Sequence, residues 1–173
     1  MVRAFAMPAL LSLQTLRKRS MLLTDLVAPN AIIPALKVNS KKQVLQELAT
    51  KAAELCGQSE RTILEILQQR EKLGSTGVGN GIAIPHGKLP KLSKLFGLFA
   101  RLERPVEFEA LDGQPVDLVF LLLAPEAAGA DHLKALARVA RLLRDADVAR
   151  KLRDSRDADA LYAVLAMPSA SAA

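Results

Sequence analysis

The stretch that decides the fold reads Gly74-Ser-Thr-Gly-Val-Gly-Asn-Gly-Ile-Ala-Ile-Pro-His-Gly-Lys88, and it holds one of only two histidines. Its glycines allow tight turns and bring backbone N–H groups close to a ligand. The apolar residues 82–84 then predict a short buried strand. Pro85 favours an extended Ile84 and lacks an N–H donor, so we expect strand pairing to stop there. His86 should lie near the surface at the mouth of a strand, followed by a flexible Gly87.

Two nucleotide-binding motifs with a similar glycine spacing do not fit this stretch. A Walker-type phosphate loop needs Gly-x4-Gly-Lys-Ser/Thr before a helix, but Asn80 follows Gly79 and a strand is expected next. A dinucleotide fingerprint that begins at Gly77 needs a third glycine where Ile82 stands. From the spacing alone, the simplest interpretation is a glycine-rich turn with a histidine at a strand end.

Strands are predicted on both sides of this stretch. Residues 31–38 contain Pro34, which is typical of an edge strand. Residues 95–102 form another strand, which Arg104-Pro105 should close. Residues 116–124 are an almost continuous apolar run, and such a run favours a central strand that is covered on both faces. With the strand at 81–84, the pattern indicates a mixed sheet of four or five strands.

Helices should pack on this sheet. Ser40 and Gln43 form a capping box before a helix that Gly57 ends, and Ser59 caps a second helix that should end near residue 72. A third helix is expected at about 131–143 and two short ones at 148–153 and 158–166, after a helical turn at 22–26. The apolar side of the third helix is expected to contain Leu133, Leu136, Ala137, Ala140 and Leu143. Helices on both faces make a three-layer α/β/α sandwich.

Composition favours one globular domain that does not bind nucleic acid. Half of the 173 residues are hydrophobic, which suffices for a core, and only 3% are aromatic. The net charge is +6, but four of the 24 basic residues and no acidic residue lie in residues 1–20. The remainder, with 20 basic and 18 acidic residues, is nearly neutral and lacks aromatic stacking residues, which argues against nucleic-acid binding.

The ends of the chain have a different character from its middle. Residues 1–20 lack a small-x-small cleavage site after their apolar run, and that run is too short and broken to span a bilayer. We expect them to be a disordered extension, residues 21–166 to be the domain, and residues 167–173 to be a flexible tail. The single Cys56 has no partner for an intramolecular disulfide, consistent with a reducing cytoplasm. We expect a cytoplasmic protein that is not an integral membrane protein.

A resemblance gives these residues a function. The segment from Arg70 through Lys88 resembles the signature of the fructose/mannitol class of phosphotransferase-system enzyme IIA domains and is most similar to the nitrogen-branch enzyme IIA proteins. Residues 131–137 (Asp-His-Leu-Lys-Ala-Leu-Ala) resemble the segment with that family's second histidine. The similarity runs from about residue 21 to residue 166 and implies the same α/β/α fold.

The resemblance implies a phosphocarrier. A histidine phosphocarrier protein would donate a phosphoryl group to His86, with Arg70 and His132 as supporting residues, and the phosphorylation state would control binding to regulatory target proteins. No cofactor and no metal is implied, and we expect a monomer or a weak dimer.

The residues themselves suit this chemistry. A neutral imidazole with an ordinary pKa of about 6.5 is largely nucleophilic at cytoplasmic pH. One ring nitrogen attacks, and the other needs an acceptor such as a backbone carbonyl. Arg70 offers a fork for two phosphate oxygens. Ser75, Thr76 and loop N–H groups such as that of Gly87 are candidate neutral donors. The resemblance does not settle Ser75, Thr76 or Lys88, for which the alternative is that they build the loop or face solvent.

Other functions remain open from the sequence. A sugar-branch enzyme IIA would pass its phosphoryl group to a separate IIB protein. A small-anion binding module would use the glycine loop without forming phosphohistidine. A membrane-associated adaptor would depend on residues 1–20. Two histidines, one cysteine and no acids clustered near His86 argue against a metal site.

Overall fold

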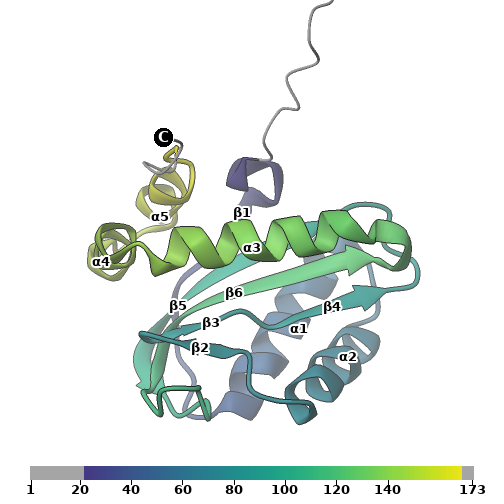
Figure 1. Ribbon diagram of the computed structural model, residues 1–173, viewed down its shortest axis with the longest axis horizontal. Helices are drawn as coiled ribbons and strands as arrows, with labels where there is room; N and C mark the ends of the chain where they lie inside the picture. Colours follow the sequence, from purple (N-terminus) through teal and green to yellow (C-terminus); the bar gives the residue numbers. More distant parts are fainter. Residues whose placement is uncertain (1–21, 169–173) are drawn as a thin grey trace, which may run out of the picture.

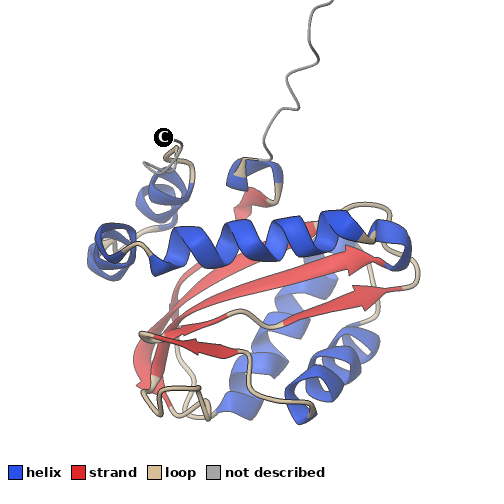
Figure 2. Cartoon of the chain, in the orientation of Figure 1, coloured by secondary structure: helices blue, strands red, loops and turns tan. Residues whose placement is uncertain are grey.

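The structure is a computed structural model that describes residues 22–168 (Figure 1). Its strands form one mixed sheet with helices on both faces (Figure 2), which confirms the α/β/α sandwich. The sheet has six strands rather than four or five, because short strands flank the predicted one in the glycine-rich stretch. The extension predicted at 1–20 and residues 169–173 of the predicted tail lie outside the described residues.

The sheet is built around the buried strand β6. The strand order of the sheet is β1-β5-β6-β3-β2, and β4 also pairs with β6. The pairs of β6 with β3 and β4 are parallel and its pair with β5 is antiparallel, while β1 lies at an edge, as Pro34 predicts. The bounds are β1 Val27–Leu36, β2 Gly77–Gly79, β3 Ile82–Ala83, β4 His86–Leu89, β5 Phe96–Val106 and β6 Val116–Pro125.

Strand pairing does not stop at Pro85, contrary to the prediction. Ile82 lies opposite Leu118 and His86 lies opposite Leu122, so β3 and β4 follow the same edge of β6 in one register. Pro85 lacks an N–H, but its carbonyl still accepts from the Leu122 N–H at 3.0 Å. The proline therefore removes one donor without ending the ladder, and His86 begins a strand instead of following one.

Strand β5 is also longer than predicted. It continues through Arg104-Pro105, which was expected to close it. The register against β6 shifts between Arg101 and Val106. A bulged segment of this kind leaves residues outside the ladder, so a proline there removes no pairing hydrogen bond.

Two helices cover one face of the sheet. They are α1 (Lys41–Cys56) and α2 (Glu60–Lys72), and each begins as predicted with a serine cap, the Ser40 and Ser59 side chains accepting from backbone N–H groups. Gly57 ends α1 in the left-handed conformation, with φ of 70°. A hydrophobic cluster that includes Leu48, Ile63 and Leu67 fills the space between these helices and the sheet.

The other face is covered by α3 (Ala130–Arg144), α4 (Ala146–Asp154) and α5 (Ala158–Leu165), together with the short 3-10 turns η1 (Leu23–Asp25) and η2 (Glu126–Ala128) near its border. The long α3 crosses this face in Figure 1. The apolar side predicted for α3 is confirmed only in part: Leu143 is buried and Leu136 and Ala140 pack partly buried against the core, whereas Leu133, 68% exposed, and Ala137 face solvent. The other buried residues of α3 are His132, Ala135, Val139 and Leu142. None of the helices within residues 22–168 is long and apolar enough to span a membrane.

Candidate functional site

The two histidines meet where three elements converge. His86 is the first residue of β4, Arg70 lies in the last turn of α2, and His132 lies in the first turn of α3. In Figure 1, β4 runs between α2 and the start of α3. The three side chains share an open depression of about 640 Å³, whose lining residues are Ile66, Gln69, Arg70, Lys72, Leu73, His86, Gly87, Lys88 and His132.

Hydrogen bonds fix the imidazole of His86 on both sides. Its Nδ1 lies 2.8 Å from the Ile84 carbonyl oxygen, which only accepts, so Nδ1 carries the ring proton. The Nε2 atom therefore carries no proton, and its lone pair accepts a hydrogen bond from Arg70 Nε at 3.2 Å. Arg70 Nη1 in turn donates to the Gly74 carbonyl oxygen at 2.8 Å. The nucleophilic nitrogen therefore faces a guanidinium group that the glycine loop orients.

His132 brings a second imidazole to the same place. Its ring centroid lies 5.8 Å from that of His86, with the ring planes at 64°. The residue is only 7% exposed, and its Nε2 is buried without a hydrogen-bond partner in the described part of the chain. Because buried polar atoms in native proteins are nearly always paired, this nitrogen is available to a group bound between the rings.

Both histidines are shifted toward the neutral form. Burial lowers the pKa of His86 below its ordinary 6.5, and the positive charge of Arg70 lowers it further, while the Ile84 carbonyl and Glu71 act in the opposite direction. Burial also lowers the pKa of His132, with smaller contributions from His86 and Lys88. Neutral imidazoles are the forms that attack electrophiles.

The structure does not bring Ser75 and Thr76 into the depression. Ser75 Oγ donates to the Phe108 carbonyl oxygen at 2.7 Å and accepts from the Gly77 N–H. Thr76 is 3% exposed, and both its N–H and its hydroxyl donate to the Glu71 carboxylate. These hydroxyl groups hold the glycine loop, and they are occupied by protein groups on its inner side.

Gly87 and Lys88 do line the depression, but Gly87 is not a flexible joint. It pairs with Leu123 inside β4, and a Cβ atom at this position would lie 2.3 Å from Ile66 Cγ2 on α2. The missing side chain lets α2 approach the strand closely, which brings Arg70 toward His86.

We expect Gly87→Ala to destabilise the domain by about 1–3 kcal/mol, the usual effect of overpacking, because the Ile66 methyl group sits on a stiff β-branched carbon. Thermal unfolding would measure the loss. The matched control is Gly87→Ala combined with Ile66→Ala, which removes the clashing methyl group and should unfold at a higher temperature than Gly87→Ala alone. An unchanged midpoint for Gly87→Ala would contradict this account of the contact.

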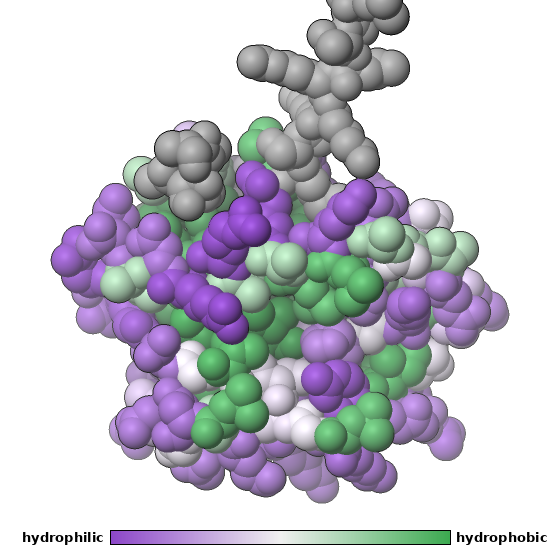
Figure 3. Space-filling model, in the orientation of Figure 1, coloured by the Kyte–Doolittle hydropathy of each residue, from purple (hydrophilic) through white to green (hydrophobic). Residues whose placement is uncertain are grey.

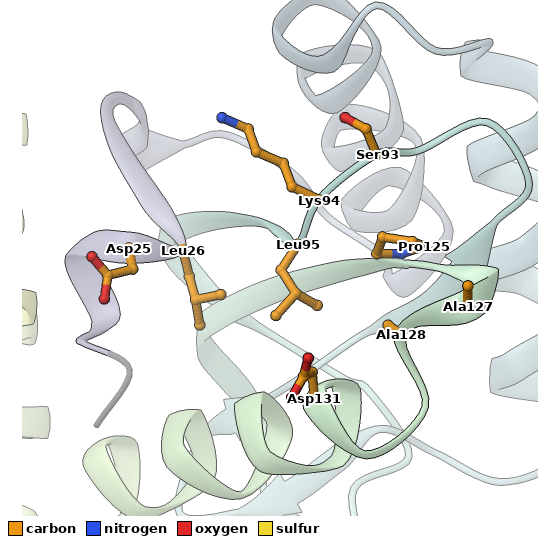
Figure 4. Close-up of a pocket in the computed structure, with 9 residues that line it drawn as sticks. All are labelled: Asp25, Leu26, Ser93, Lys94, Leu95, Pro125, Ala127, Ala128 and Asp131. Carbon is orange, nitrogen blue, oxygen red and sulfur yellow. The ribbon is translucent and has the colours of Figure 1, made fainter. Parts of the chain in front are cut away.

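A second hollow of about 430 Å³ lies elsewhere, near η1 and the start of α3 (Figure 4). Leu26 and Leu95 point into it, whereas the Lys94 side chain extends away. It contains neither histidine, and the charged residues that line it are exposed. Within residues 22–168, no three His, Cys, Asp or Glu side chains gather in a way that suits a metal ion. The histidine depression is therefore the stronger candidate.

Comparison with known proteins identifies the family. The family model described as "Phosphoenolpyruvate-dependent sugar phosphotransferase system, EIIA 2" matches residues 25–167. The chain belongs to this EIIA 2 family. A "Nitrogen regulatory protein" of Bradyrhizobium diazoefficiens is 77% identical to this EIIA 2 domain over 151 residues, which cover 87% of this chain and 99% of that protein. A protein of the same name from Escherichia coli is 42% identical and covers 73% of this chain and 78% of its own.

Solved structures agree with this assignment. The nitrogen regulatory protein IIA-Ntr of Neisseria meningitidis has a TM-score of 0.79 and 35% identity to this EIIA 2 domain, and the match covers 83% of this chain and 98% of that one. The mannitol IIA of Escherichia coli shares the fold, with a TM-score of 0.69, 22% identity and coverage of 80% and 98%.

The sequence predicted a backbone carbonyl as a candidate acceptor for the His86 ring but did not identify it, and it did not predict the main-chain partner of Arg70 in this EIIA 2 site. The carbonyl oxygens of Ile84 and Gly74 are the partners of His86 and Arg70. Every residue type has such a carbonyl, so no residue type signals which one is used. Proline at 85 is the nearest available signal, because it marks a local break in the donor pattern of the strand.

Proposed function

We propose that this EIIA 2 domain is a phosphocarrier that accepts a phosphoryl group on His86 Nε2 from a phosphorylated histidine protein. The observation that carries the proposal is the ring geometry. Nδ1 is held by the Ile84 carbonyl, so the lone pair of Nε2 is directed at Arg70. A nucleophilic nitrogen beside a guanidinium group is the arrangement that phosphoryl transfer between imidazoles requires.

The transfer needs no reactant other than the two imidazoles and the phosphoryl group. The Nε2 lone pair forms a bond to phosphorus while the N–P bond of the donor breaks, and that electron pair returns to the donor imidazole. The same lone pair now accepts from Arg70 Nε, so the guanidinium must leave Nε2 and bind the phosphoryl oxygens instead. The fork of Arg70 can hold two of these oxygens while its other contact with Gly74 persists.

His132 completes the oxygen contacts in this proposal. Its unpaired Nε2 is buried and near the His86 ring, and a donor there would stabilise charge on the phosphoryl group. Lys88, exposed on the rim of the depression, adds positive charge nearby. Thr76 and Ser75 are outside the contact set because protein groups occupy their hydroxyls.

The surroundings of the depression suit a protein donor. Leu73 on its rim is 86% exposed, and Leu133, next to His132 in sequence, is 68% exposed. In Figure 3, the face crossed by α3 carries apolar patches among hydrophilic residues. Exposed apolar side chains that surround a polar centre are typical of protein-binding surfaces.

The regulatory branch is the favoured output. Relatives from Bradyrhizobium diazoefficiens and Escherichia coli carry the name "Nitrogen regulatory protein", so we propose that the phosphorylation state of His86 governs binding to regulatory target proteins in the cytoplasm. Transfer from the phosphorylated chain to a IIB protein would favour the sugar branch instead. Anion binding without acid-labile phosphate would favour a binding module.

The decisive experiment reconstitutes the phosphoenolpyruvate relay. The chain is mixed with phosphoenolpyruvate, the first enzyme of the relay and the histidine phosphocarrier protein, and the modified residue is mapped under alkaline conditions that preserve phosphohistidine. Acid-labile phosphate on His86 supports the proposal, and no phosphate on a folded chain contradicts it.

The lowered pKa of His86 predicts how transfer depends on pH. Because the pKa of His86 lies below 6.5, more than half of the rings are neutral at pH 6.5, so the single-turnover rate should fall in acid with a midpoint below pH 6.5. An NMR titration of the ring nitrogens would give the pKa directly. A midpoint at or above 6.5 would contradict the desolvated environment described here.

His132→Ala is expected to slow transfer to His86 by about tenfold while leaving His86 as the modified residue, because it removes one neutral hydrogen bond to the phosphoryl oxygens, worth up to about 1.5 kcal/mol. Rapid-quench transfer from the phosphorylated carrier would measure the rate. His132→Asn, which restores a neutral N–H donor, is the control and should recover part of it. Equal rates for wild type and His132→Ala would exclude His132 from the site.

A further inference from the structure

Next to Arg70, the buried Glu71 carboxylate is bound by several donors. Its side chain is 6% exposed, and its Oε2 lies 2.8 Å from Lys41 Nζ at the start of α1. The Thr76 N–H donates to Glu71 Oε1 at 3.1 Å, and the Thr76 hydroxyl donates to the same oxygen. Lys41 also lies over the Phe108 ring, 5.1 Å from its centroid. The carboxylate therefore joins both helices of one layer to the glycine loop.

Thr76, which Glu71 holds, links to both hydrogen-bond partners of His86. The Thr76 carbonyl accepts from the Ile84 N–H at 2.9 Å, and Ile84 supplies the carbonyl that fixes His86 Nδ1. Two residues before Thr76, the Gly74 carbonyl accepts from Arg70 Nη1, and Arg70 Nε donates to His86 Nε2. A single carboxylate thus anchors the loop whose carbonyls determine what each ring nitrogen contacts.

We propose that Glu71 is a positioning residue for phosphoryl transfer, acting through Thr76 and the Gly74 carbonyl on Arg70 and through Thr76 and Ile84 on the His86 ring. This inference rests on the proposed function. Glu71 touches neither ring nitrogen of His86, and its effect is to keep Arg70 and the ring in the geometry that transfer needs. Small displacements of such groups slow the reaction strongly, since a misplacement of about 1 Å reduces the rate by up to a hundredfold.

The test compares Glu71→Gln with Glu65→Gln, an exposed glutamate on the same helix that pairs with Arg61. Glu71→Gln keeps the shape but loses the charge, so it should slow single-turnover transfer to His86 by about tenfold or more, with donor affinity unchanged. Glu65→Gln should match wild type. A folded Glu71→Gln protein with the wild-type rate would overturn the proposal.

The titration of His86 distinguishes positioning from a loss of folded protein. Charged and titratable groups reach the ring from α2 (Arg70 and Glu71), from α3 (His132) and from its own strand (Lys88). Glu71 raises the pKa of His86, so Glu71→Gln should move the NMR midpoint of His86 to lower pH and weaken its preference for the Nδ1-protonated tautomer. An unchanged midpoint and tautomer would count against the proposal even in a chain that accepted no phosphoryl group.

Variants at Thr76 keep the proposal testable if Glu71→Gln fails to fold. Thr76→Ala removes one donor to Glu71 but retains the backbone N–H, and it should slow transfer several-fold. Thr76→Ser restores the hydroxyl and should recover most of the rate. A wild-type rate for folded Thr76→Ala would overturn the role of this contact. If the wild-type protein is not phosphorylated, the proposed function is refuted. The titration of the His86 ring does not depend on phosphorylation, so it still tests the role of Glu71.

Discussion

A His86→Ala protein is expected to fold normally and to accept no phosphoryl group. The imidazole is half-buried at the first residue of β4, and its side chain makes one hydrogen bond to the Ile84 carbonyl and accepts one from Arg70. Losing these bonds costs on the order of 1–3 kcal/mol, and backbone pairing with Leu122 remains. The loss of transfer should be complete, because no other described side chain combines a free imidazole lone pair with this guanidinium contact.

The measurement is incorporation of labelled phosphate from phosphoenolpyruvate through the relay, with circular dichroism to verify the fold. His132→Ala serves as the matched control, since it removes the other imidazole of the same depression and should still take up phosphate. Undiminished, acid-labile phosphate on folded His86→Ala would disprove the assignment of the acceptor.

Arg70→Lys should reduce the single-turnover transfer rate by about a hundredfold, the usual effect of losing one well-placed donor in a transition state. Arg70 now contacts Gly74 through Nη1 and His86 through Nε. A lysine ammonium is a point charge and cannot make both contacts or hold two phosphoryl oxygens in a plane. The charge is kept, so a large loss would be due to geometry.

Arg61→Lys is the control for this variant, because Arg61 is an exposed arginine on the same helix and pairs with Glu65 of that helix. Its transfer rate should equal that of wild type. Arg70→Lys should still be modified on His86, only more slowly. A wild-type rate for Arg70→Lys would remove Arg70 from the transfer step and leave His86 as the residue supported by geometry.

Much of this architecture could be predicted because local signals act on the backbone directly. Ser40, Gly57 and Ser59 mark helix ends through hydrogen bonds and a left-handed conformation, and the apolar run of β6 marks the central strand. The effect of prolines was harder to predict. Pro85 lies between β3 and β4, which pair with β6 in one register, and Pro105 lies within β5. A ladder tolerates one missing donor when the neighbouring pairs stay in register or the chain bulges.

The candidate site could be predicted only in part. His86, Arg70 and His132 come together as the resemblance implies, whereas Ser75 and Thr76 point to other partners. A hydroxyl group in a glycine loop can bind a ligand or a neighbouring backbone group, and sequence does not distinguish the two. On α3, His132 faces inward and its neighbour Leu133 faces solvent, although Leu136, Ala140 and Leu143 of the predicted apolar side do pack on the core. The apolar pattern therefore predicted most of the buried side of α3 but not its first turn.

The hydrogen bond from His86 Nδ1 to the Ile84 carbonyl also bears on how easily a bound phosphoryl group departs. A backbone carbonyl, unlike a carboxylate, is too weak a base to take the ring proton. A phosphorylated ring would therefore keep that proton and carry a positive charge, and breaking its N–P bond would release a neutral imidazole, which is a good leaving group. A main-chain acceptor at Nδ1 thus favours a His86 that passes its phosphoryl group on as readily as it accepts it.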